Sequence, residues 1–247
     1  MMRRPRLNTI LAVALAGGIA GLLLWSAPEA SRGGAVATER VRELIASTGA
    51  SNSVCSIVLG ARLLDTLFEV LVFSVAVLGV RWMLERGGPD PSAGEPRTHS
   101  VLAPVAEIAE SDVVRRSAYL LFPPVTLLGI YLAVFGHLSP GGGFGGGAVA
   151  ASGLLLVAVA VGAQTVARRF HEQALARLEW GVVAVILGIA LVSSLLGAPK
   201  SGLLPAGVPG ELTGGGWLLV YNLLIAIKVF LGGWAIIHLF IEHRGEI

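Results

Sequence analysis

The chain has 247 residues, of which 54% are hydrophobic and only 14% are charged, and its formal net charge is +2. This composition, with a mean hydropathy of +0.77, excludes an ordinary soluble domain, in which about a quarter of the residues are charged. It also argues against a nucleic-acid partner, because phosphate binding requires clustered basic side chains. The predicted environment is therefore the lipid bilayer.

Six apolar segments are long enough to cross the hydrocarbon core as helices, which takes about 20 residues. These segments are 7–25, 53–80, 117–138, 144–163, 180–198 and 217–240. Their apolar residues are continuous rather than alternating, which argues against membrane strands. We therefore predict an all-α, polytopic membrane protein of about six transmembrane helices.

The first segment, 7–25, follows three arginines and precedes Ser26, Ala27 and Pro28, so it could be a cleaved signal peptide. Its uninterrupted apolar run is longer than a usual signal core, which favours a membrane anchor. Most Lys and Arg residues fall in the segments that would be cytoplasmic if the N-terminus is cytoplasmic. We therefore predict that both termini are cytoplasmic.

Two stretches interrupt the apolar pattern. Residues 36–45 place apolar side chains opposite charged ones, which predicts an amphipathic helix on the outer membrane surface or, alternatively, a plain loop. Residues 87–99 are rich in Gly and Pro and predict a flexible linker. The predicted organisation is a two-helix module (1–86), a cytoplasmic linker (87–111) and a four-helix membrane domain (112–247).

The second apolar segment carries a charged side. Arg62, Asp65 and Glu69 are spaced by three and four residues, which places them on one side of a helix. Segment 53–80 is centred near residue 67, so the carboxylates are expected near the bilayer midplane, where each charge costs about 2.5 to 3.5 kcal/mol. We expect this side to face protein or a hydrated cavity. Arg62 would then offset one carboxylate and leave the other to bind a proton or a cation.

Two further residues could extend such a relay. Lys228 is central in the last apolar segment, at a depth expected to match Glu69, and a buried lysine is a common proton-relay device. His137 ends the third segment and could pass protons near the outer surface. The alternative is that Arg62, Asp65, Glu69 and Lys228 pair only as polar contacts between helices or with another subunit.

A glycine loop, PGGGFGGG, joins the third and fourth segments. It satisfies G-x-G-x-x-G, but no strand precedes it and no acidic residue follows at the required distance, so we exclude a dinucleotide site. Glycines at the start of a membrane helix let a neighbouring helix pack very close. We expect a structural motif made of Pro140, Gly141, Gly142, Gly143 and Phe144.

Enzyme signatures are missing from the sequence. No Ser or Cys within a predicted helix has a credible base partner, and no pair of histidines is placed to ligate haem. The single cysteine, Cys55, excludes an internal disulfide and a zinc or iron–sulfur centre built from cysteines. We therefore predict no catalytic residue, no metal and no cofactor.

Residues 131–153, YLAVFGHLSPGGGFGGGAVAASG, closely resemble the signature of the MnhB-type subunit of Mrp sodium/proton antiporters. Residues 52–84 resemble the C-terminal segment of the large MrpA-type subunit, through Arg62, Asp65 and Glu69 among others. The same two modules occur as separate small subunits in membrane-bound hydrogenases and related ion-pumping respiratory complexes. The chain departs from the pattern at Gly145, where the family commonly has Gln, and at 60–61, where the family has an Asp-Phe pair.

The resemblance implies a multi-pass subunit of the cell membrane that works with other hydrophobic subunits to exchange Na⁺ for H⁺. It also implies that Glu69 and Asp65 lie on an ion or proton route. One alternative is a membrane-arm subunit of a hydrogenase-like or respiratory ion-pumping complex. Another is a structural scaffold subunit that transports nothing.

Overall fold

The computed structural model describes residues 34–86, 111–162, 165–166, 172–196 and 204–242. The predicted helix at 7–25, nearly all of the linker at 87–111 and both termini lie outside these residues. The chain divides into two compact units, residues 1–43 and 44–247. Residues 34–43 of helix α2 (Gly34–Thr48) are the described part of the first unit, and the helix predicted over 36–45 is confirmed. Its position on a membrane surface stays a prediction.

The second unit consists of helices. In chain order they are α3 (Ser53–Cys55), the π-helical η1 (Ser56–Ala61), α4 (Leu63–Arg86), α6 (Asp112–Val134), α7 (Gly143–Val161), α9 (Glu172–Leu195) and α10 (Trp217–Glu242). Among the described residues, five helices are long and apolar enough to cross a membrane, or six if the broken pair Thr38–Thr48 and Ser53–Ala61 is one span. The predicted all-α membrane fold is confirmed.

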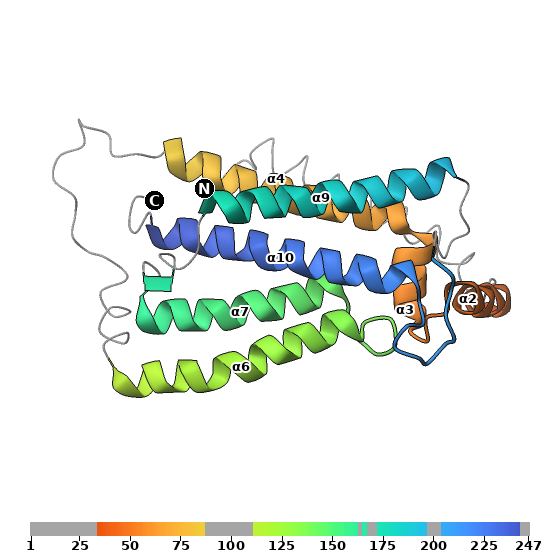
Figure 1. Cartoon of the computed structure of the whole chain (residues 1–247), viewed down its shortest axis with the longest axis horizontal. Helices are drawn as coiled ribbons and strands as arrows, with labels where there is room; N and C mark the ends of the chain where they lie inside the picture. The colour runs from red at the N-terminus through yellow and green to blue at the C-terminus, as the bar shows by residue number, and fades with distance from the viewer. Residues whose placement is uncertain (1–33, 87–110, 163–164, 167–171, 197–203, 243–247) are drawn as a thin grey trace, which may run out of the picture. The chain divides into compact units, whose positions relative to one another are not determined.

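Helix α10 is central in the bundle. It packs against α4, α6, α7 and α9. In Figure 1, α4, α7 and α10 run in one direction and α6 and α9 run in the other, as successive membrane crossings require. One apolar cluster joins α4, α9 and α10, with Val70, Ile186 and Leu218 almost completely buried. A second cluster joins α7 to α10 around Leu154 and Trp234.

Glycines let α7 pack tightly between α6 and α10. A Cβ atom on Gly146 would lie 2.6 Å from the backbone oxygen of Gly129 on α6. On the other side, a Cβ atom on Gly143 would lie 2.5 Å from a backbone oxygen of α10, and the same distance separates Gly147 from that helix. Backbones that approach this closely leave no room for a side chain, so van der Waals packing holds these three helices together.

Two helix boundaries differ from the sequence prediction in ways that affect the site. Segment 53–80 is not one helix, because the helix is interrupted at Arg62, whose backbone has φ −116° and ψ 33°. The fifth segment begins at Glu172 rather than at Trp180, which brings Glu179 inside a helix. Hydropathy detects only apolar residues. It therefore predicted one helix where η1 and α4 are separated at Arg62, and it left out the charged residues at the start of α9.

Candidate functional site

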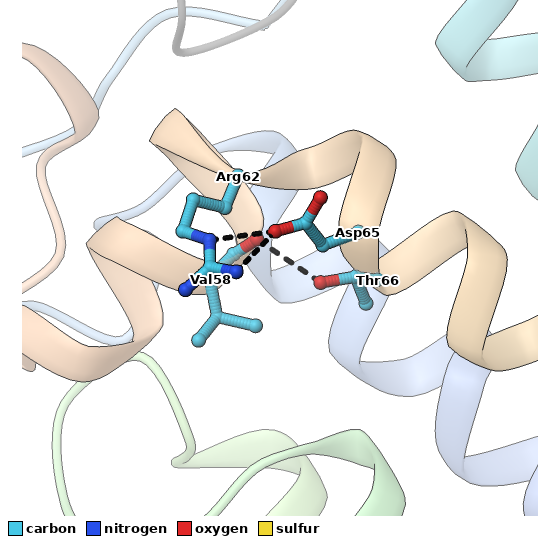
Figure 2. A network of polar contacts seen from close by, with 4 residues as sticks. All are labelled: Val58, Arg62, Asp65 and Thr66. Atoms are coloured by element: carbon cyan, nitrogen blue, oxygen red, sulfur yellow. Dashed lines mark hydrogen bonds and ion pairs between the residues drawn. The ribbon is translucent and has the colours of Figure 1, made fainter. Parts of the chain in front are cut away.

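The interruption of the helix at Arg62 is the first polar feature inside the bundle. The Arg62 N–H donates to the Ile57 carbonyl oxygen at 2.8 Å, the longer-range bond of a π-helical turn. The Thr66 hydroxyl donates to the Val58 carbonyl oxygen at 3.0 Å, so a side chain satisfies an acceptor at the break (Figure 2). Interrupted backbone at membrane depth is tolerated where protein or water satisfies it, and π-helical turns are frequent at functional sites.

An ion pair lies directly beside this break. Arg62 Nε lies 2.6 Å and Nη2 lies 2.5 Å from Asp65 Oδ2, as Figure 2 shows. Both side chains are more than half exposed, at 69% and 53%. Glu69 follows one turn later and is also exposed, and no described side chain pairs with it. Among the described residues, Arg62 therefore offsets the charge of Asp65 but not that of Glu69.

The depth predicted for these carboxylates changes with the break. The apolar span of α4 is Leu63–Leu84, so its centre lies between Phe73 and Ser74. Asp65 is in the first turn of that helix, about 13 Å from the centre at 1.5 Å per residue. Asp65 therefore lies nearer the end of this span than its centre, and its depth in the bilayer stays a prediction. Glu69 lies about 7 Å from the centre.

The second polar feature is a buried ion pair between α9 and α10. Lys228, at the centre of the α10 span, is completely buried, and its Nζ atom lies 3.2 Å from Glu179 Oε1 on α9. The atoms are at ion-pair distance, but their geometry is not that of a hydrogen bond. The ammonium also lies 3.9 Å from the ring centroid of Phe73 on α4, a cation–π contact. Three helices thus meet at one charge.

A glycine makes room for this arrangement. Gly232 lies one turn after Lys228 on α10, and a Cβ atom there would lie 2.8 Å from Phe73 Cε1 and 3.1 Å from Glu179 Oε1. Any larger residue at this position would displace the ring or the carboxylate. A buried Lys–Glu pair can exist as two ions or, after one proton moves between them, as two neutral groups. The arrangement is therefore chemically able to hold and release a proton.

His137 lies in the connection between α6 and α7, at the end of the bundle where α10 begins. Asn52 holds this connection: its side-chain amide donates to the carbonyl oxygens of Gly136 and Ser139, each at 2.8 Å. The His137 side chain is completely buried, and neither ring nitrogen makes a hydrogen bond to any described residue. Its ring packs on Gly215, where a Cβ atom would lie 3.2 Å from Cδ2.

The glycine loop meets α10 through Asn222. The Gly143 N–H at the start of α7 donates to Asn222 Oδ1 at 3.0 Å. Gly142, just before the helix, has φ +144°, which strongly favours glycine. A cavity of about 190 Å³ lies here. It is lined by α10, by Val58 and Thr66 beside the helix interruption, and by Gly141, Gly142, Gly143 and Phe144 of the loop. Pro140, the first residue of the loop, is exposed.

The sequence-predicted residues therefore form separate groups. Arg62, Asp65 and Glu69 lie together on α4, whereas Lys228 pairs with Glu179 rather than with Glu69, and His137 lies at the end of the bundle. Sequence reasoning missed Glu179 because the predicted fifth segment began one residue after it. Its position just before a long apolar run was the available signal. Across the ranges that the structure describes, no group of His, Cys, Asp or Glu could hold a metal ion.

Comparisons with known proteins found a matching family and similar chains. Residues 113–235 match the family described as a domain related to the MnhB subunit of a Na⁺/H⁺ antiporter. An uncharacterized protein of Methanocaldococcus jannaschii is 27% identical over 202 residues, and the match covers 73% of each chain.

Two solved structures share the fold. A chain of the membrane-bound sulfane sulfur reductase, an archaeal respiratory membrane complex, is 26% identical with a TM-score of 0.63, and the match covers 95% of this chain and 98% of that one. A chain of the Mrp complex from Dietzia sp. DQ12-45-1b is 23% identical with a TM-score of 0.62. That match covers 100% of this chain but 27% of the Dietzia chain. Both neighbours are parts of multi-subunit membrane complexes.

Proposed function

We propose that this chain, whose residues 113–235 match the family of MnhB-related domains, is one membrane subunit of a multi-subunit monovalent cation/proton antiporter. It spans the cell membrane several times, with both termini in the cytoplasm, and its partners are other hydrophobic subunits. The ions exchanged are Na⁺ and H⁺. The chain itself has no enzymatic activity.

The observation that carries this proposal is the complete burial of Lys228 at the centre of a membrane span. A charge at that depth is costly, and such residues typically mark ion or proton pathways. We assign the relay to Glu69, Asp65, Arg62, Lys228 and His137, with Glu179 added as the partner of the lysine. The Arg62–Asp65 pair and the exposed Glu69 then form the part of the relay that faces another subunit.

Transport in everted membrane vesicles tests this assignment. We expect Glu69→Gln and Asp65→Asn to lower sodium/proton exchange strongly while the complex still assembles. Glu211→Gln is the matched control, because Glu211 is an exposed carboxylate in the loop before α10. If both α4 variants assemble and exchange ions as the wild type does, the relay is refuted and the chain is a scaffold.

A second candidate function is a membrane-arm subunit of a respiratory complex. The specific observation in its favour is the match to the sulfane sulfur reductase chain, which spans nearly the whole of both chains, whereas the Mrp match covers 27% of its counterpart. Affinity purification of the native complex separates the two candidates. Co-purifying iron–sulfur subunits would establish the respiratory assignment, and a complex made only of hydrophobic subunits would establish the antiporter.

A further inference from the structure

One face of α10 carries a row of side chains whose polar atoms are buried. Trp217, Tyr221 and Lys228 are spaced by four and seven residues, which places them within a narrow sector of the helix. Trp217 Nε1, Tyr221 Oη and Lys228 Nζ are buried, and none makes a hydrogen bond to a described residue. Both ring nitrogens of His137 are also buried without a hydrogen bond to a described residue. The His137 ring packs on Gly215, which precedes Trp217 by two residues.

Helix α9 contributes a matching row. Glu179, Ile186 and Ser193 recur every seven residues and so face one way, and Ser193 Oγ is also buried without a hydrogen bond to any described residue. Because α9 runs antiparallel to α10 (Figure 1), Ser193 belongs to the end where α10 begins, and Glu179 to the level of Lys228. The contact between α9 and α10 therefore has polar groups at both ends.

Buried polar atoms are nearly always hydrogen-bonded, either to protein or to ordered water. Thr126 Oγ1 on α6 is an isolated exception, but three of the exceptions share one face of α10 and lead to a buried ion pair. Tyr and His side chains can both donate and accept a hydrogen bond, so they can pass a proton. The Trp217 indole N–H only donates, so its role is to orient a water molecule.

We propose that the α9/α10 contact is an internal water-filled proton path, which begins at His137 and ends at the Lys228–Glu179 pair. This inference rests on the proposed function and names the route by which protons reach its central charge. Trp217 and Lys228 are about 16 Å apart along the helix axis, and Tyr221 divides this distance. Tyr221 and Lys228 are about 10 Å apart along the axis, and the apolar cluster that contains Tyr221 also contains the fully buried Val70 and Ile186, so the proposed path crosses apolar surface there.

Hydroxyl-radical labelling of the assembled complex in lipid nanodiscs tests the water directly, because radicals formed from internal water modify side chains that bulk solvent does not reach. Tyr221 and Trp234 are matched in burial, at 3% and 4% exposed, but Trp234 packs in the α7 cluster beside His238. We expect Tyr221 to be labelled several-fold faster than Trp234. Equal labelling of the two would overturn the proposal.

Ion exchange by the Tyr221→Phe variant tests whether the path conducts protons. This variant keeps the ring and removes the hydroxyl, and losing one link of the path is expected to lower exchange about ten-fold. Tyr131→Phe is the control, because Tyr131 is exposed on α6. Wild-type exchange in Tyr221→Phe would refute the path even if Tyr221 is labelled. A wild-type complex that exchanges no ions would instead refute the proposed function, and labelling would still decide whether the contact holds water.

Discussion

Replacing Glu179 with Gln removes the acidic half of the buried pair and leaves Lys228 without a counter-charge. At 3.2 Å the two charges attract each other by about 5 kcal/mol at an effective dielectric constant of about 20. Removing one partner of a buried ion pair typically costs about 3 to 5 kcal/mol. The glutamine oxygen keeps a polar group 3.2 Å from Nζ, so we expect the lower end of this range, a loss of about 3 kcal/mol in the free energy of unfolding for Glu179→Gln.

The double variant separates stability from transport. Lys228→Met combined with Glu179→Gln removes both charges and fills nearly the same volume, so its stability is expected to return to within about 1 kcal/mol of the wild type. Ion exchange should not return, because no titratable group remains at the centre of α10. Denaturant unfolding in mixed micelles measures the first quantity, and everted vesicles measure the second.

Two outcomes would refute this reasoning. If Glu179→Gln unfolds as the wild type does, the pair does not stabilise the fold as a charged contact. If the double variant is stable and still exchanges ions, the pair is a structural contact and lies off the pathway. A stable but inactive double variant supports the relay.

Three further predictions concern the surroundings of this pair. Phe73→Leu removes the cation–π contact and should cost about 2 kcal/mol in unfolding experiments, whereas Phe68→Leu, on the exposed side of α4, should cost under about 0.5 kcal/mol; equal effects would exclude the contact. Gly143→Ala should destabilise by about 1 to 3 kcal/mol, because its Cβ atom would overlap α10, and Gly145→Ala, with nothing within 4 Å, should unfold as the wild type does. Arg62→Gln should change stability by less than about 1 kcal/mol, because its ion pair is exposed, and a larger loss would mean that the pair is buried in the isolated chain.

The approximate positions of five of the six expected membrane helices could be predicted because each is a long apolar run, which is a property of composition. The helix interruption at Arg62 could not be predicted, because the segment from Ser56 to Ala61 is mostly apolar, as it would be within one continuous helix. The π-helical turn arises instead from backbone hydrogen bonding. The break also places Asp65 in the first turn of α4 rather than near the middle of a longer helix, whereas its depth in the bilayer stays a prediction.

The candidate site was predictable in its ionisable residues but not in their partners. Lys228 stands out in the sequence because it interrupts an apolar segment. Its partner Glu179 lies 49 positions earlier, at the charged start of another helix, and only the antiparallel packing of α9 and α10 brings the two within 3.2 Å. Phe73 carries no charge and was inconspicuous among other apolar residues.

Gly232 suggests how to identify relatives that keep this pair. The position one turn after the lysine is occupied on two sides, by the Phe73 ring and by the Glu179 carboxylate. A relative with a larger residue there cannot hold the same ring and acid in place, so it should also have changed one of them. In an alignment, these positions should therefore vary together: Lys228, Glu179, Phe73 and Gly232. Such co-variation would distinguish subunits that carry a central charge from those that share only the fold.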